Sequence, residues 1–273
     1  MWRTLERERI ARFPGARGRI PNFVGAERAA ERLAEQREWT RARVIKANPD
    51  APQLAVRARA LADGKRVYMA VPRLRSARPF LLLDPKRIRV SPRAAASIAG
   101  AARHGRAVSI EEVEPIELIV CGTVAVNREG VRVGKGGGYS DLEFALLAET
   151  GRVSGRTTIA TTVHDLQVTD DELPETAHDF RVDLVVTPTE VWRPMRRKRP
   201  RGLIWSDLDA GKIAEIRRSA RERRLWHVLL ASAQRGGRVL ERDALLQVVA
   251  EREAVARRLG RSLAPEPLVQ KPV

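Results

Sequence analysis

The sequence contains a single cysteine, Cys121, and only four histidines. One cysteine can form no disulfide within the chain and cannot supply the paired thiolates of a structural zinc site. This scarcity is typical of a protein from a reducing compartment, so we expect a cytoplasmic location. His164 and His178 each precede an aspartate. We expect these two histidines to form loop hydrogen bonds rather than acid–base dyads or a zinc site, because adjacent residues point in different directions on a strand.

Long hydrophobic runs are also missing. No stretch approaches the roughly 18 apolar residues that a membrane-spanning helix needs. The first residues, M-W-R-T-L-E-R, lack the apolar core of a signal peptide. We therefore expect neither a membrane span nor a secretory leader. Apolar residues still make up 43% of the chain, which is enough for a folded core and excludes wholesale disorder.

The charge is strongly one-sided. Lysine and arginine total 51 against 34 acidic residues, giving a net charge of +17. Such a balance suits a protein that binds nucleic acid, and equally one that handles small polyanions such as nucleotides and phosphates. Much of the excess lies at residues 193–224, where arginine dominates. No DNA- or RNA-binding motif accompanies this segment, so nucleic-acid binding is the less favoured of the two interpretations.

The length of 273 residues favours one main domain with an appendage. Near-continuous apolar runs alternate with amphipathic segments, a pattern typical of a parallel sheet with helices on both faces. We predict an α/β fold with an open, mainly parallel sheet over residues 1–216, followed by a basic helical extension over 217–273. The expected helices are 26–40, 52–62, 91–103, 141–149 and 225–259, and the expected strands are 67–71, 80–83, 88–90, 116–122, 159–163 and 182–187.

A glycine-rich segment, R-V-G-K-G-G-G-Y-S-D at residues 132–141, carries the chemistry. Ser140 and Glu143 have the spacing of a capping box, which predicts a helix starting at Asp141. The glycines would then lie at a helix N-terminus, where free backbone N–H groups and the helix dipole favour an anion. Lys135 and Arg132 add positive charge. The segment therefore predicts a phosphate-binding loop, with a glycine-rich turn that binds nothing as the alternative.

The loop does not follow the two common phosphate-binding patterns. Lys135 precedes the glycines, so G-x-x-x-x-G-K-[ST] is not met, and the spacing of G-x-G-x-x-G also fails. Asp141 would be repelled by a bound polyphosphate unless a cation joined them, and Mg²⁺ is the usual bridge. Asp179, just before a buried strand, is the second candidate ligand. Each aspartate alone could instead be a helix cap or a solvated turn residue.

The segment resembles the signature R-[LV]-G-x-G-x-G-Y-[YSA]-D of the 5-formyltetrahydrofolate cyclo-ligase family, also called methenyltetrahydrofolate synthetases. Two further family elements follow in order: a glutamine after the next strand, like Gln167, and H-D-x-x-[VL]-D, like residues 178–183. Five other segments resemble the methenyltetrahydrofolate synthetase domain-containing branch of this family. They are R-I-P-N-F (19–23), K-A-N-P-D (46–50), P-R-L-R (72–75), T-V-H-D-L-Q-V (162–168) and R-P-R-G-L-I-W (199–205).

The resemblance implies a fold grouped with ribose-5-phosphate isomerase and coenzyme A transferases. It also implies a reaction, the ATP- and Mg²⁺-dependent cyclisation of 5-formyltetrahydrofolate to 5,10-methenyltetrahydrofolate. By motif match, Lys135 and Arg132 would be catalytic, and Asp141 and Asp179 would hold Mg²⁺. Lys135, Gly138 and Tyr139 would border the reduced folate. The residues implied for ATP are Arg132, Gly134, Lys135, Gly136, Gly137, Gly138, Tyr139 and Ser140.

Two departures from the family pattern leave the substrate open. The family's N-terminal helix carries an ATP-binding lysine, and the present sequence begins just after the corresponding position. Ser140 replaces the second tyrosine of the commoner Y-Y-D. The branch-specific segments lie outside the glycine-rich loop, where another small molecule would be recognised. One alternative is a relative that keeps the ATP site but takes such a molecule, and the resemblance to the branch suggests a thiamin-related one. The other alternative is a nucleic-acid-binding protein that uses residues 193–224. The sequence does not specify the oligomeric state.

Overall fold

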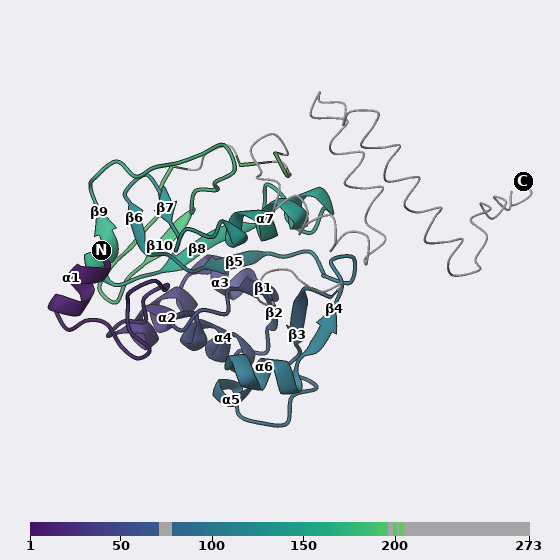
Figure 1. The fold of residues 1–273 in the computed structure, drawn as a ribbon. Coiled ribbons are helices and arrows are strands. Elements are labelled where there is room, and N and C mark those ends of the chain that lie inside the picture. The colour runs from purple at the N-terminus through teal and green to yellow at the C-terminus, as the bar shows by residue number, and fades with distance from the viewer. Residues whose placement is uncertain (71–77, 196–198, 201, 205–273) are drawn as a thin grey trace, which may run out of the picture. The chain divides into compact units, whose positions relative to one another are not determined.

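The computed structural model describes residues 1–70, 78–195, 199–200 and 202–204 (Figure 1). These residues belong to one compact unit of the chain, Met1–Leu229. The predicted helix 225–259 and the predicted extension 217–273 lie outside the described residues, as does most of the basic segment 193–224.

The core of the fold is an eight-stranded sheet with the order β11-β10-β8-β5-β1-β2-β3-β4. The five central strands, from β10 to β2, run parallel, and the outer strands β11, β3 and β4 pair antiparallel. The predicted open, mainly parallel sheet is thus confirmed. The strands are β1 (Val44–Ala47), β2 (Arg66–Ala70), β3 (Phe80–Leu83), β4 (Arg106–Val108), β5 (Leu118–Cys121), β8 (Thr158–Thr162), β10 (Leu184–Val186) and β11 (Val191–Trp192).

Helices cover both faces of this sheet (Figure 1). Leu118 and Val120 of β5 face one apolar cluster, which includes α2 to α6, while Ile119 and Cys121 face a second cluster formed with α7. Because the central strands are buried on both faces, they consist of near-continuous apolar residues. The helices are α1 (Trp2–Arg7), α2 (Ala26–Ala34), α3 (Arg37–Arg41), α4 (Gln53–Ala62), α5 (Pro92–Ala96), α6 (Ile98–His104) and α7 (Tyr139–Glu149).

A second, three-stranded sheet lies beside α7 (Figure 1). Strand β6 (Ala125–Asn127) pairs antiparallel with β7 (Arg132–Val133) and parallel with β9 (Val168–Thr169). The turn between β6 and β7 contains Gly130, whose φ of +81° is easily adopted only by glycine. This hairpin delivers the chain into the glycine-rich segment, and the 3₁₀ helix Asp165–Gln167 leads into β9.

Several predicted elements differ from the structure. The helix expected over 26–40 is broken into α2 and α3, and the one expected over 91–103 is broken at Ser97, whose hydroxyl accepts a hydrogen bond from Gly100 N and starts α6. The strand expected at 88–90 is wrong, since Val90 is 39% exposed and no strand pairs with it. Strand β1 was not predicted, because Lys46 interrupts its apolar pattern.

Candidate functional site

The glycine-rich segment joins β7 to α7 at the carboxyl ends of the parallel strands. Gly136 and Gly138 have φ angles of +92° and +64°, which other residues adopt only at a cost. Gly138 is the N-cap of α7, and no side chain of the described residues caps this helix. The first turn of α7 therefore begins directly from the loop, with its backbone N–H groups and dipole directed toward it. Around Gly136 no other heavy atom lies within 4 Å of the position a β-carbon would take, so the loop is open there.

The predicted capping box is wrong. Helix α7 starts at Tyr139, two residues before the predicted start, because the left-handed Gly138 already begins the helix. Ser140 therefore lies within the first turn, where its hydroxyl accepts a hydrogen bond from Asn48 Nδ2 at 3.2 Å. The carboxylate of Glu143 lies 2.5 Å from Lys46 Nζ. The predicted end of the helix at Glu149 is confirmed.

Three polar residues after and within β1 hold this segment in place. Lys46, which is 1% exposed, donates to Asn48 Oδ1 at 2.7 Å in addition to its ion pair with Glu143. Asp50 lies 3.6 Å from the half-exposed ammonium group of Lys135. The segment K-A-N-P-D marked a branch of the family in the sequence, but its place beside the loop was not predicted. Its polar residues alternate at the end of a strand, and this alternation is the signal that could have indicated a site.

Arg132 lies buried beneath the loop. Its guanidinium donates to Asp141 Oδ1 at 2.6 Å and stacks on the ring of Phe180, 4.2 Å from the centroid. A β-carbon at Gly134 would lie 3.6 Å from Arg132 Nη1. Burial by itself would lower the pKa of Arg132, but Asp141 and other groups raise it above its usual value. Arg132 is therefore a charged residue that supports both the loop and the first turn of α7.

The two predicted metal ligands, Asp141 and Asp179, both interact with Arg132. The charges of both Asp141 and Asp179 act on its guanidinium. Asp179 Oδ2 also accepts hydrogen bonds from the backbone and hydroxyl of Thr176, at 2.7 and 2.9 Å. In the part of the chain that the structure describes, no three acidic, histidine or cysteine residues cluster to hold a metal. The donor set does fit the mode in which Mg²⁺ is held by one or two carboxylates and by phosphate oxygens, with Asp141 in the first turn of α7 as one carboxylate that would hold it.

Further polar side chains lie at and just after the carboxyl ends of β5 and β8. Gln167 is 1% exposed, and its amide donates to the carbonyl oxygens of Thr123 and Val124 at 2.9 and 3.1 Å. The hydroxyls of Thr123 and Thr161 lie 2.8 Å apart. His164 Nδ1 accepts a hydrogen bond from Leu166 N, and burial lowers the pKa of this histidine. The expected loop role of His164 is thus confirmed.

These features define an open α/β protein whose polar residues gather at the carboxyl ends of β1, β5 and β8, the edge where such folds bind ligands. Residues 2–188 match the profile of the 5-formyltetrahydrofolate cyclo-ligase family. This match covers more than half of the chain, and the protein belongs to that family.

Several relatives carry the name methenyltetrahydrofolate synthase domain-containing protein. The chain is 36% identical to the protein of Bos taurus over 222 residues, 37% to that of Mus musculus over 231 residues and 34% to that of Homo sapiens over 221 residues. These alignments cover 79%, 82% and 79% of the chain and 58%, 62% and 57% of the relatives. The chain thus spans about three fifths of the length of these relatives.

Two solved structures are also similar. The NMR structure of Aquifex aeolicus 5,10-methenyltetrahydrofolate synthetase is 23% identical with a TM-score of 0.43, and it matches 64% of this chain and 83% of its own. A 5,10-methenyltetrahydrofolate synthetase from Mycoplasma pneumoniae is 12% identical with a TM-score of 0.37, and it matches 59% of this chain and 83% of its own. Among the described helices, none is long and apolar enough to cross a membrane.

Proposed function

We propose that this protein uses ATP and Mg²⁺ to convert 5-formyltetrahydrofolate into 5,10-methenyltetrahydrofolate. The observation that carries the proposal is the open glycine loop at residues 134–138, which runs with Lys135 into the uncapped N-terminus of α7. Family membership supports the choice of reaction. The loop supports the choice of a phosphorylated co-substrate, because backbone N–H groups at a helix N-terminus stabilise phosphate.

The proposed reaction has two steps. The γ-phosphoryl group of ATP is transferred to the formyl oxygen, with ADP as the leaving group. N10 of the folate then attacks the activated formyl carbon, its proton is lost, and inorganic phosphate leaves as the methenyl ring closes. Phosphoryl transfer needs positioning and charge neutralisation more than it needs a protein nucleophile. Mg²⁺ supplies part of that neutralisation when it is bound.

In this proposal, the residues in and around the loop have separate roles in binding and catalysis. Lys135 is more than half exposed beside the loop, and we propose that it leaves Asp50 to contact the transferring phosphoryl group. The backbone of residues 134–140 holds the ATP phosphates, while Gly138 and Tyr139 border the folate. Arg132 acts in this proposal from beneath the loop, where it holds Asp141 toward the bound Mg²⁺. Asp179, whose charge also acts on Arg132, is the second proposed ligand.

The direct test mixes the protein with MgATP and 5-formyltetrahydrofolate and follows the absorbance of methenyltetrahydrofolate. We expect product with the wild type, and at least a tenfold lower rate with Lys135→Ala. Gly155→Ala is the matched control, because a β-carbon there would meet nothing within 4 Å and its φ is not positive. An absorbance trace that stays flat with the wild type would overturn the proposed reaction.

A second candidate keeps the ATP site and changes the small-molecule substrate. It is favoured by the position of K-A-N-P-D, a marker of the branch that contacts the loop through Lys46, Asn48 and Asp50. Calorimetry separates the two candidates. Binding of MgATP without binding of 5-formyltetrahydrofolate would select the second, whereas binding of both would select the first.

A further inference from the structure

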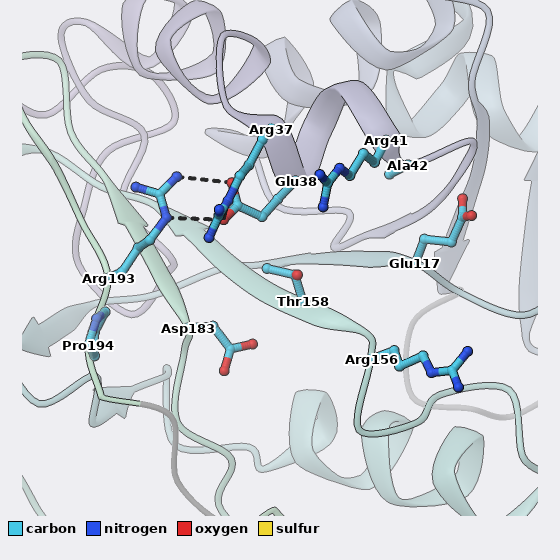
Figure 2. Close-up of a pocket in the computed structure, with 10 residues that line it drawn as sticks. All are labelled: Arg37, Glu38, Arg41, Ala42, Glu117, Arg156, Thr158, Asp183, Arg193 and Pro194. Carbon is cyan, nitrogen blue, oxygen red and sulfur yellow. Dashed lines mark hydrogen bonds and ion pairs between the residues drawn. The ribbon is translucent and has the colours of Figure 1, made fainter.

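A second candidate site lies at the other end of the parallel strands from the glycine loop. The structure contains a cavity of about 520 Å³ at the amino ends of the parallel strands (Figure 2). Ala42 lies just before β1, Glu117 just before β5 and Asp183 just before β10, and Thr158 is the first residue of β8. The glycine loop lies beside Asn48 and Asp50, which follow the carboxyl end of β1, so the two sites are at opposite ends of the parallel strands. A cavity of this volume accommodates a small molecule.

Two carboxylates in the wall of the cavity accept hydrogen bonds from other residues of the protein. Glu117 Oε2 accepts hydrogen bonds from two backbone N–H groups at the start of β1, at 2.5 and 2.9 Å. Asp183 Oδ2 accepts from the backbone of Ile159 at 2.8 Å and from the guanidinium of Arg199. Both side chains thus satisfy donors at the amino edge of a neighbouring strand, donors that would otherwise be left without partners.

The third carboxylate, Glu38, belongs to an ion pair. Two nitrogens of Arg193 donate to its two oxygens at 3.0 Å each. The hydrogen bond from Arg193 is the main reason that the pKa of Glu38 is lowered to about 2. Glu38 is therefore ionised and compensated by Arg193, and Asp183 is compensated by Arg199. Glu117 is bound by neutral N–H groups and keeps its charge, so one carboxylate of the wall faces the three guanidinium groups of Arg37, Arg41 and Arg156.

Arg41 and Arg156 provide the surplus charge. Their side chains make no hydrogen bond or ion pair with any residue in the described part of the chain, and Arg37 has only a 3.4 Å contact between its Nε and Glu38. Figure 2 shows Arg37 and Arg41 reaching the cavity from α3, with Arg156 on the opposite side and Thr158 between them. Each guanidinium has five donors in a planar arrangement that matches the oxygens of an oxyanion.

We propose that this cavity binds the dianionic phosphate group of a small molecule, at a site separate from the glycine loop. Arg41 and Arg156 bind the phosphate oxygens from opposite sides, and Arg37 and Thr158 supply further donors. A phosphate fits better than a single carboxylate because the guanidinium groups of Arg37, Arg41 and Arg156 all line the cavity and outnumber the carboxylate of Glu117, and because phosphate offers enough oxygens for two bidentate contacts. This site goes beyond the proposed reaction, which does not use the amino edge of the sheet.

Titration with inorganic phosphate tests the site in the whole protein. We expect phosphate to raise the melting temperature at constant ionic strength, relative to chloride, and to bind at least tenfold more weakly to the double variant Arg41→Gln/Arg156→Gln. The matched control is Arg89→Gln/Arg103→Gln, which removes the same charge at exposed positions outside the cavity. Lys135→Ala separates the two sites, because it removes a cation of the glycine loop and should leave this phosphate binding intact.

The side-chain Nε–Hε NMR signals of Arg41 and Arg156 provide a second measurement on the wild type, independent of how well the variants fold. We expect these signals to shift during the phosphate titration and to saturate. The proposal is overturned if the signals do not move, or if the double variant binds phosphate as tightly as the wild type. Loss of phosphate binding in Lys135→Ala alone would assign the effect to the glycine loop and would also overturn the second site.

Discussion

At the scale of single residues, the site depends on buried charges that have specific partners. Arg132 and Asp141 form a close pair beneath the loop, while Lys135 remains more than half exposed above it. Removing one member of a buried pair leaves an uncompensated charge in the interior, whereas removing an exposed lysine changes little. Mutation of Asp141 should therefore lower the stability of the protein, whereas mutation of Lys135 should leave its stability almost unchanged.

For Asp141→Asn we expect a loss of roughly 3 kcal/mol of stability, near the lower end for a broken buried pair because Asp179 also acts on Arg132. For Lys135→Ala we expect a stability change within about 0.5 kcal/mol and loss of the stabilisation that MgATP gives to the wild type. Thermal melting with and without MgATP measures both effects. A loss of only about 0.3–1 kcal/mol in Asp141→Asn would instead identify Asp141 as a residue that serves only the helix N-terminus.

Glu38 should make stability depend on pH. Its pKa is about 2 in the folded protein, mainly through the hydrogen bond from Arg193, against an ordinary value of 4.5. A lowered pKa means that ionised Glu38 stabilises the fold above pH 4.5, and that this stabilisation is lost as the pH falls toward 2. Wild type and Glu38→Gln should therefore differ in melting temperature at pH 6 and converge near pH 2.

The control for this measurement is Glu111→Gln, at an exposed residue with no side-chain partner among those described. It should follow the wild type throughout the acid range. A constant difference between Glu38→Gln and the wild type from pH 6 to pH 2 would contradict the role of the Arg193 pair.

At the scale of elements, β1 and α7 are joined by polar side chains that cross from the sheet to the helix. Lys46 pairs with Glu143, and Asn48 donates to Ser140, so the end of β1 fixes the first turn of α7. The glycine loop enters this turn, and its conformation is thereby tied to the central sheet. The predicted capping box was wrong for this reason, because its two side chains are used between elements rather than within the helix.

A double-mutant cycle tests this connection. Lys46→Met should cost about 3–5 kcal/mol, because it leaves the buried carboxylate of Glu143 without its cation. Adding Glu143→Leu should restore most of that loss, since a buried ion pair can often be replaced by apolar residues. Urea denaturation of the wild type, both single variants and the double variant gives the coupling. Costs that simply add would show that the two side chains do not stabilise each other.

At the scale of the whole molecule, one sheet carries two apolar layers. Leu118 and Ile119 are neighbours on β5, are 0% and 2% exposed, and face opposite layers. The glycine loop lies at the carboxyl ends of the parallel strands, and the arginine-lined cavity lies at their amino ends. Of the basic segment 193–224, the two arginines that the structure describes, Arg193 and Arg199, are ion-paired with Glu38 and Asp183, so nucleic-acid binding would depend on the remainder.

Both layers should contribute to one folding transition of this unit. Leu118→Ala and Ile119→Ala should each cost about 2–5 kcal/mol, because each leaves a cavity in a close-packed layer. Ile98→Ala is the control, since Ile98 is 61% exposed and its loss should change stability by no more than about 0.5 kcal/mol. Far- and near-UV circular dichroism should report the same midpoint for each variant. Separate midpoints in one variant would show that the layers unfold independently.

The sequence by itself determined the type of sheet, the position of the glycine loop and the family. Each of these depends on order along the chain: apolar runs long enough for strands buried on both faces, glycines clustered before a helix, and short motifs that follow one another in a fixed order. Only the tertiary structure brought Lys46, Asn48 and Asp50 to the loop, since more than 80 residues of the chain separate each of them from its partner, Glu143, Ser140 or Lys135. It likewise gathered Arg41 and Arg156 at one cavity. Contacts between distant segments depend on how strands are ordered in the sheet, and no pattern along the chain specifies that order.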